Sequence, residues 1–311
     1  MSPMTSTHPC ASESGGPTLD ASVIIPTYQD WAGLGECLAH LADQDVDPSC
    51  FEVIVGNNNP ARELPDDLEV PAGVRFVWEP TPGSYAARNA AVAASSGRVL
   101  FFTDADCRPT RTWISRGLQL LEADAAADRL AGQIRLTSPG DRWGIPELYD
   151  RLFNLRQARY VARGYGATAN LVVRRTLFDR VGPFDASLYS SGDKEWNRRA
   201  GALGSTIRYA EDLVVEHGAR ATFEEHARKR ARVTKGRYMM RRSARRSARR
   251  SSGWSQLRYH LPSLSAAKVI LGASELSLSE RWGLWRFDQR LRFVECDTRR
   301  RLMDGTAADH R

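Results

Sequence analysis

The sequence is poor in cysteine, and its cysteines form no pattern that would stabilise a fold or bind zinc. Five occur among 311 residues, with no CxxC pair and no Cys/His spacing typical of a zinc site. We interpret them as reduced thiols, which are typical of a reducing cytoplasm. The five are Cys10, Cys37, Cys50, Cys107 and Cys296.

Long hydrophobic runs are also absent. No stretch approaches the roughly 18 to 20 uncharged apolar residues of a membrane-spanning helix, so a polymer-extruding, polytopic synthase is not expected. Residues 1–16 are polar and lack the basic start and apolar run of a signal peptide. We expect a disordered leader over residues 1–18, and a protein that is cytoplasmic or peripheral on the inner face of the membrane.

Acidic residues are missing from one long segment. His226 to Ser274 contains 14 Lys and Arg and no Asp or Glu, whereas the whole chain has a net charge of +7. The remainder, at +7 less 14, is therefore acidic, and the basic character belongs to one segment. This shift and the length predict a folded domain over residues 19–221 and a basic, amphipathic helical extension over residues 222–311.

Short apolar runs alternate with helical patterns in the folded domain. The sequence is 42% hydrophobic and 26% charged, as in globular proteins, and the alternation predicts a mostly parallel, doubly wound α/β sheet flanked by helices. Strands are expected at Ala21–Pro26, Phe51–Val55, Val74–Trp78, Arg98–Thr103, Leu130–Leu136, Ala169–Val173, Thr206–Tyr209 and Leu213–Glu216. Helices are expected at Ser84–Ser95, Trp113–Asp124, Ile145–Val161, Arg175–Val181, Asp193–Leu203 and Leu276–Val294.

Polar clusters follow three of these strands, at the sheet edge where ligands bind in such folds. They are Thr27-Tyr28, Asn57-Asn58-Asn59 and Asp104-Ala105-Asp106. Two carboxylates one residue apart can hold one Mg²⁺ or Mn²⁺ ion and leave positions for phosphate oxygens. An isolated triplet of this kind is more often a solvated turn, but the apolar Phe101-Phe102 pair in front predicts a buried strand that points it at a cleft.

Four further polar residues have both a functional and a structural interpretation. Asp193 and Glu195 open a helix behind a glycine, where acids often only cap the helix. His217 follows the last strand and is either a metal ligand or a core histidine. Arg88 either reaches a pyrophosphate or lies on a solvated helix face.

The motifs occur together in one order: VIIPTY, FEVIVGNNN, GSYAARNAA, VLFFTDADC, GATANLVVRRTLFDRVGPFD, GDKEW and VVEH. In this combination the chain resembles the family 2 inverting glycosyltransferases with the GT-A fold, from about Ala21 to about Ala221. The resemblance implies transfer of a single sugar from a nucleotide-diphosphate sugar to an acceptor hydroxyl. It further implies a role in cell-envelope, polysaccharide or glycolipid biosynthesis.

The resemblance also implies roles for individual residues. Asp193 becomes the catalytic base, and Glu195 orients the acceptor or that base. Mg²⁺ or Mn²⁺ would be held by Asp104, Asp106 and His217. The donor would be bound by Pro26, Thr27, Tyr28, Asn57, Arg88, Asp104, Ala105 and Asp106. Asn57 departs from the family, which commonly has an aspartate there, so the identity of the donor base stays open. UDP-sugars are the commonest donors in the family and are favoured, with GDP- and dTDP-sugars as alternatives.

Other functions are weighed against this one. A catalytically silent nucleotide-sugar binding protein is suggested by Asn57, and a nucleotidyltransferase would share the α/β start and the metal. The basic residues of 228–250 form a solvated tail, bind an anionic membrane surface or, less plausibly, bind nucleic acid. An apolar stripe for the membrane could come from Trp282, Leu284, Trp285, Phe287, Leu291 and Phe293.

Overall fold

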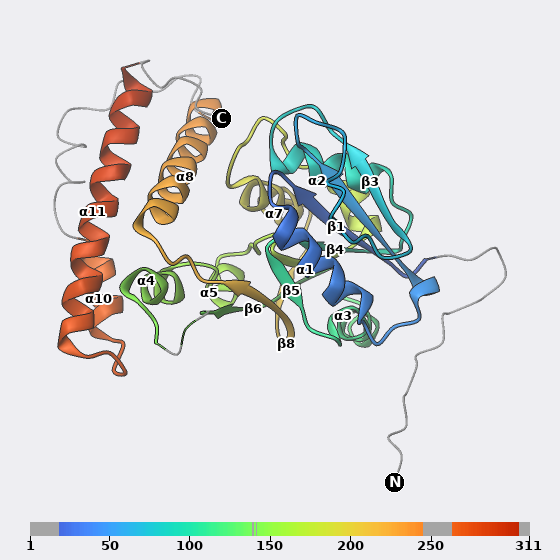
Figure 1. Cartoon of the computed structure of the whole chain (residues 1–311), viewed down its shortest axis with the longest axis horizontal. Helices are drawn as coiled ribbons and strands as arrows, with labels where there is room; N and C mark the ends of the chain where they lie inside the picture. The colour runs from blue at the N-terminus through green and yellow to red at the C-terminus, as the bar shows by residue number, and fades with distance from the viewer. Residues whose placement is uncertain (1–18, 139, 141, 245–262, 305–311) are drawn as a thin grey trace, which may run out of the picture. The chain divides into compact units, whose positions relative to one another are not determined.

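The computed structural model describes residues 19–138, 140, 142–244 and 263–304. It shows a mixed sheet flanked by helices and a C-terminal helical extension, so the expected α/β class is confirmed (Figure 1). The chain divides into two compact units. Unit 1 is formed by the residues up to Thr137, Arg156–Ser187 and Gly192–Gly218; unit 2 is formed by Ser138–Leu155, Leu188–Ser191 and the chain from Ala219 onward.

Unit 1 contains an eight-stranded sheet in the order β3-β2-β1-β4-β7-β6-β8-β5. The pairs β1–β2, β2–β3, β1–β4 and β6–β8 are parallel, whereas β7 is antiparallel to β4 and β6, and β5 is antiparallel to β8. The sheet is therefore parallel at one end and mixed at the other. The strands are β1 (Ala21–Thr27), β2 (Phe51–Asn57), β3 (Val74–Trp78), β4 (Val99–Thr103), β5 (Cys107–Pro109), β6 (Arg129–Thr137), β7 (Asn170–Arg174) and β8 (Ile207–Gly218).

The parallel strands end together at one edge of the sheet. Thr27 pairs with Asn57, which in turn pairs with Trp78, so β1, β2 and β3 have a common carboxyl edge. Gly56 allows helix α2 to pack directly on β2, because a Cβ there would lie 2.4 Å from the Ala87 carbonyl oxygen. The close packing brings the first turn of α2 to the same edge.

The helices of unit 1 agree closely with the sequence patterns. They are α1 (Trp31–Ala42), α2 (Ser84–Ala93), α3 (Trp113–Ala123), α5 (Gln157–Val161), α6 (Arg175–Val181) and α7 (Gly192–Ala202), with a short 3₁₀ turn η1 (Pro48–Cys50). Apolar faces drive this packing. In α1, for example, Leu34, Leu38 and Leu41 are buried at helical spacing.

Two predictions of how the chain divides into separate elements were wrong. The single helix predicted over Ile145–Val161 is broken, because Leu155 adopts the left-handed region with φ 49° and separates α4 (Ile145–Phe153) from α5. The two strands predicted over residues 206–216 are one continuous strand, β8. Its pairing with β6 shifts register at Gly132/Gln133, and this irregularity lets the strand continue through its polar middle.

Unit 2 has its own apolar core. The helices of this unit are α4, α8 (Phe223–Ala244), α10 (Leu264–Leu271) and α11 (Leu278–Met303). Leu284, Phe287 and Leu291 of α11 are buried there. Half of the apolar stripe suggested for a membrane is therefore core, while Trp282 and Phe293 are 59% and 58% exposed. No helix among the described residues is long and apolar enough to cross a membrane.

The beginning of the basic segment contributes to this unit's buried charge network. The Asp150 carboxylate is fully buried, accepts from the Arg220 backbone amide at 3.0 Å and pairs with the Arg220 guanidinium at 3.1 Å and with Lys229 at 3.9 Å. Burial alone would raise the pKa of Asp150, but Lys229 and Arg220 outweigh it and lower that pKa. Lys229 is therefore not simply part of a solvated tail. Residues 245–262 lie outside the described part.

Candidate active site

The Asp104-Ala105-Asp106 turn leaves the carboxyl end of β4 and meets α2. Asp104 forms an ion pair with Arg88, whose side chain is almost fully buried. Two polar atoms near this edge, Thr27 Oγ1 and Arg88 Nε, are buried without a hydrogen-bond partner among the described residues. Such orphaned groups are costly unless a ligand or water pairs with them, so these two atoms are candidate contacts for a bound ligand.

Asp193 joins the same cluster from the N-terminus of α7. Its Oδ1 accepts a hydrogen bond from the Tyr85 hydroxyl at 3.4 Å and one from the Lys194 amide at 2.7 Å. Burial raises the pKa of Asp193, the Lys194 amide and Arg88 oppose the rise, and the Asp104 carboxylate adds to it. Residues more than 100 positions apart thus share one electrostatic environment.

Tyr85 is a member of the site that the sequence patterns did not identify. Its ring packs on Gly192, where a Cβ would lie 2.7 Å from ring carbon Cε2. The absence of a side chain at Gly192 makes room for this ring at the start of α7. Burial raises the pKa of Tyr85 far above its ordinary value, so the hydroxyl stays a proton donor to Asp193. Its place as the third residue of the GSYAARNAA motif was the available signal.

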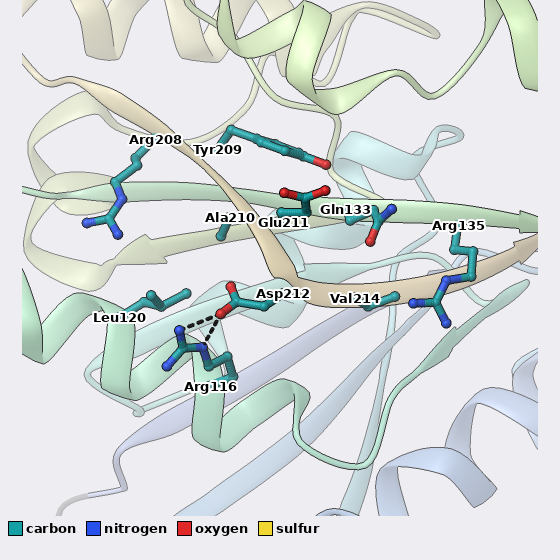
Figure 2. Close-up of a pocket in the computed structure, with 10 residues that line it drawn as sticks. All are labelled: Arg116, Leu120, Gln133, Arg135, Arg208, Tyr209, Ala210, Glu211, Asp212 and Val214. Carbon is teal, nitrogen blue, oxygen red and sulfur yellow. Dashed lines mark hydrogen bonds and ion pairs between the residues drawn. The ribbon is translucent and has the colours of Figure 1, made fainter.

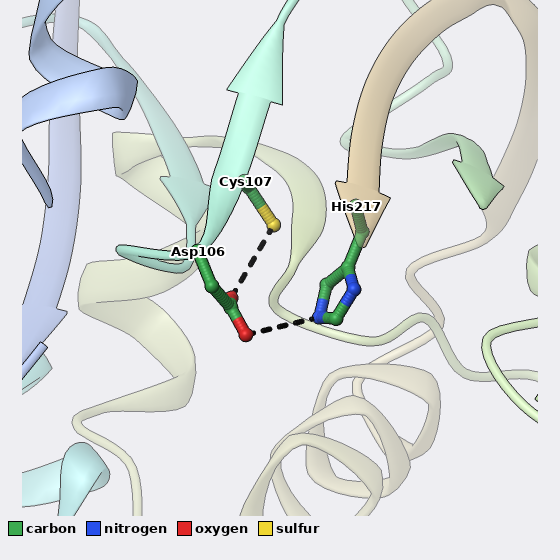
Figure 3. A group of neighbouring side chains, drawn as sticks. All are labelled: Asp106, Cys107 and His217. Carbon is green, nitrogen blue, oxygen red and sulfur yellow. Dashed lines mark hydrogen bonds and ion pairs between the residues drawn. The ribbon is translucent and has the colours of Figure 1, made fainter. Parts of the chain in front are cut away.

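Asp106 lies beside His217 and Cys107 at the end of β8 (Figure 3). His217 Nε2 is 3.2 Å from Asp106 Oδ2, and its Nδ1 is 2.6 Å from the Gly218 carbonyl oxygen. A carbonyl oxygen only accepts hydrogen bonds, so Nδ1 carries a hydrogen and donates it to Gly218. Nε2, the other ring nitrogen, faces the Asp106 carboxylate. The metal-ligand atoms of all three residues lie within 4.8 Å of one another.

This group fits a divalent cation. Oxygen, nitrogen and sulfur are all metal donors, and a histidine that donates its second nitrogen to a carbonyl is oriented as metal-bound histidines are. An electron pair on His217 Nε2 facing the Asp106 carboxylate at 3.2 Å is repulsive unless a cation or a proton lies between them. Asp104, predicted as a third ligand, lies with Arg88 and outside this group of three.

Cys107 lies near His217 although the two residues have no metal-ligand spacing in the sequence. Cys107 and His217 are directly opposed in the antiparallel β5–β8 pair, so their side chains project from the same face. They are 110 positions apart in the chain, and no spacing rule reaches that far. Burial, together with Asp104 and Asp106, raises the pKa of the Cys107 thiol well above its ordinary value. The four described cysteines are free thiols.

Other predicted residues are used within their own loops and helices. Asn57 is buried, and its Oδ1 accepts from the backbone and side-chain nitrogens of Asn59 at 3.0 and 2.8 Å. Glu195 pairs with Arg199 at 3.0 Å, and Arg199 in turn donates to carbonyls at the end of α6. Tyr28 is half-exposed just past β1, whereas Ala105 is buried.

A separate hollow of about 600 Å³ lies on unit 1 beside the irregular pairing of β6 and β8 (Figure 2). Its lining includes three arginines, and each is paired: Arg116 with Asp212, Arg135 with Glu216 and Arg208 with Asp124. None of the predicted site residues lines it. The hollow therefore adds nothing to the assignment of the site at the carboxyl edge.

The chain is similar in sequence to known proteins. The sequence model of the glycosyl transferase family 2 matches residues 22–184. Glycosyltransferase AglE of Haloferax volcanii is 33% identical over 226 residues, which cover 69% of this chain and 72% of AglE. A pre-mycofactocin glycosyltransferase of Mycobacterium tuberculosis is 26% identical over 228 residues, covering 70% of this chain and 47% of that protein.

Solved structures share the fold. The mannosyltransferase PcManGT from Pyrobaculum calidifontis, in complex with GDP-Man and Mn²⁺, has a TM-score of 0.58 at 17% identity and covers 92% of this chain and 88% of its own. S. aureus TarS in complex with UDP has a TM-score of 0.50 at 16% identity, covering 94% and 93%. The fold is that of the GT-A glycosyltransferases. The protein thus belongs to glycosyl transferase family 2 and is a glycosyltransferase.

Proposed function

We propose that the protein transfers a single sugar from a nucleotide-diphosphate sugar to an acceptor hydroxyl with inversion of configuration. The observation that carries this proposal is the convergence of three pairs at one sheet edge: Arg88 with Asp104, Tyr85 with Asp193, and His217 with Asp106. They supply a cation for phosphate, a base and a metal site, which are the parts that a single displacement at an anomeric carbon needs.

In the proposed reaction, Asp193 accepts the proton of the acceptor hydroxyl as that oxygen bonds to the anomeric carbon. The bond from this carbon to the diphosphate oxygen breaks, and its electron pair leaves with the nucleotide diphosphate. Tyr85 holds the Asp193 carboxylate in place through its hydroxyl. A divalent cation held by Asp106 and His217, with Asp104 as the third ligand implied by the family, would neutralise charge on the leaving diphosphate. Mg²⁺ or Mn²⁺ is the ion that the family resemblance implies.

The proposed donor is a UDP-sugar, with GDP- and dTDP-sugars as alternatives. The unpartnered Thr27 Oγ1 and Arg88 Nε support a donor contact at this edge. The Asn57 carbonyl oxygen accepts from Asn59, and the Asn57 amide nitrogen donates to the Arg62 carbonyl oxygen at 3.4 Å, which leaves the second N–H of this amide for a base. The two structural neighbours were solved with GDP-Man and with UDP, so both bases belong in the first test.

The decisive experiment distinguishes the role of Asp193 as the catalytic base from the role of Asp106 in binding the donor. We expect Asp193→Asn to abolish transfer and leave donor binding nearly intact, and Asp106→Ala to weaken metal-dependent donor binding. Binding is measured by thermal shift with UDP-, GDP- and dTDP-sugars, each with and without Mn²⁺, because a ligand of the native state raises stability by mass action. Equal loss of binding in both variants would contradict the assigned roles.

The same assays address the alternatives. A silent binding protein would show a thermal shift with a donor and no turnover in the unmodified chain. A nucleotidyltransferase would release pyrophosphate instead of a nucleotide diphosphate. Loss of turnover in Asp193→Asn supports the proposal against both, since neither alternative depends on this carboxylate as a base for an acceptor hydroxyl.

We further propose that the basic segment 228–250 contacts an anionic membrane surface, which would present a lipid-linked or surface-bound acceptor. In the part that the structure describes, Arg228, Arg232 and Arg237 are exposed on α8. Trp282 and Phe293 of α11 are exposed aromatic side chains of the kind found at membrane interfaces.

A further inference from the structure

We propose that Cys107 is a ligand in the metal site, so that the site takes a transition-metal cation through oxygen, sulfur and nitrogen in preference to Mg²⁺. The inference deepens the proposed function, because it concerns the same metal site. It rests on the placement of Cys107 opposite His217 and beside Asp106 (Figure 3).

The distances suit a compact coordination shell. Cys107 Sγ is 3.9 Å from Asp106 Oδ1, and His217 Nε2 is 3.2 Å from Asp106 Oδ2. Ligand atoms at about 2.0 to 2.3 Å from a tetrahedral zinc-like ion are about 3.3 to 3.5 Å apart. All three ligand atoms lie within 4.8 Å of one another, so side-chain shifts of about 1 Å would place them around one ion.

Backbone and hydrogen bonding hold two of the three ligands in advance. Cys107 and His217 are fully or almost fully buried and are held across from each other by the β5–β8 ladder. His217 is further oriented by its hydrogen bond to the Gly218 carbonyl, the kind of outer-shell contact that fixes metal-binding histidines. Asp106 is half-exposed and supplies the side that is open to substrate.

The chemistry of the donor set predicts the preference. Mg²⁺ requires oxygen ligands in near-octahedral geometry and dehydrates reluctantly. An imidazole, together with the thiolate that forms when a bound metal ion displaces the Cys107 proton, instead favours the later first-row ions such as Co²⁺ and Zn²⁺. Serine at position 107 would restore an oxygen-dominated site, so one atom at this position decides the class of ion.

Cobalt is the probe, because a Co²⁺–thiolate bond gives a charge-transfer absorption in the near ultraviolet that oxygen and nitrogen ligands do not give. The whole chain is titrated with Co²⁺ without any nucleotide, and bound metal is counted by equilibrium dialysis. We expect the band in the unmodified protein and in the control Cys50→Ser, which removes a buried thiol of unit 1 at the opposite, amino end of β2.

Cys107→Ser should lose the band and bind Co²⁺ at least about tenfold more weakly, the scale on which lost outer-shell contacts already act. A large excess of Mg²⁺ should displace Co²⁺ from this variant more readily than from the unmodified protein. His217→Ala provides a second test if the serine variant does not fold, and it should also lose the band.

Three results would overturn the inference: no Co²⁺ bound to the unmodified protein, Co²⁺ bound without the band, or an unchanged band in either variant. The titration contains no sugar donor, so its outcome is independent of turnover. A protein that shows the band and transfers no sugar would refute the proposed function and leave the cysteine-containing metal site standing.

Discussion

Asp193 is half-buried at the start of α7, and burial raises its pKa. A general base works only when ionised, so activity is expected to fall as the pH drops through this raised pKa and to level off above it. The acid limb of the kcat/KM profile should therefore lie above the roughly 3.9 of an ordinary aspartate.

Tyr85→Phe offers a matched control for this pH dependence, because the ring stays and only the hydroxyl bonded to Asp193 is lost. That hydroxyl lowers the pKa of Asp193, so its removal should move the acid limb upward. A limb unchanged by the substitution would argue that a different group controls the profile.

Gly192 is a second position where the addition of one carbon atom is expected to change activity. A methyl group there would meet the Tyr85 ring at 2.7 Å, so Gly192→Ala must displace the ring that donates to Asp193. We expect a large loss of kcat, and a stability loss of about 1 to 3 kcal/mol, typical of an overpacked site. Steady-state kinetics and thermal unfolding measure the two effects.

Gly201→Ala in the same helix is the control for that substitution. Nothing lies within 4 Å of a Cβ at position 201, and alanine favours a helix by about 1 kcal/mol over glycine. This variant should keep full activity. If both glycine variants lose activity alike, the contact with Tyr85 is not the cause.

At the scale of the elements, the packing of α4 in unit 2 depends on the buried carboxylate of Asp150. Asp150 is fully buried between Arg220 and Lys229, and the pKa of Lys229 is lowered, chiefly by burial, to about 7. Asp150→Asn leaves these cations without a carboxylate and should destabilise unit 2 by about 3 kcal/mol, as when one partner of a buried ion pair is removed. Denaturant unfolding measures the loss.

The matched control for α4 is Asp297→Asn on α11, which removes a carboxylate that pairs with Arg300 and Arg301 at the surface. Exposed pairs stabilise little, so the control should unfold almost as the unmodified protein does. A loss at Asp150 no larger than that of the control would mean that the buried network is not stabilising.

At the scale of the whole molecule, the uneven charge predicts binding to anionic vesicles. Arg228→Glu with Arg232→Glu should weaken binding to such vesicles, measured by flotation, at least about tenfold, since each basic residue near the surface contributes about 1 kcal/mol. The control Arg163→Glu with Arg180→Glu changes the net charge equally at exposed positions of unit 1. Equal effects of both pairs would indicate general electrostatics, and a salt-sensitive gel shift with no flotation would favour nucleic acid.

The α/β class, most elements of unit 1 and the family were predictable from the sequence. Periodicity and turn residues act over a few positions, so strands such as Val74–Trp78 and helices such as Arg175–Val181 were located without error. The order of the motifs along the chain indicated the family that the comparisons confirm. Periodicity and turn residues are local signals, and the family is recognised from motifs that occur in one order along the chain.

The tertiary structure alone decided what local signals cannot carry. Leu155 breaks a helix whose amphipathic pattern is continuous, because the chain passes there from unit 2 to unit 1. Leu284, Phe287 and Leu291 are core because α4 and α8 belong to the same compact unit. Cys107 meets His217, and Tyr85 meets Asp193, only because strand pairing and helix packing bring together residues that lie more than 100 positions apart.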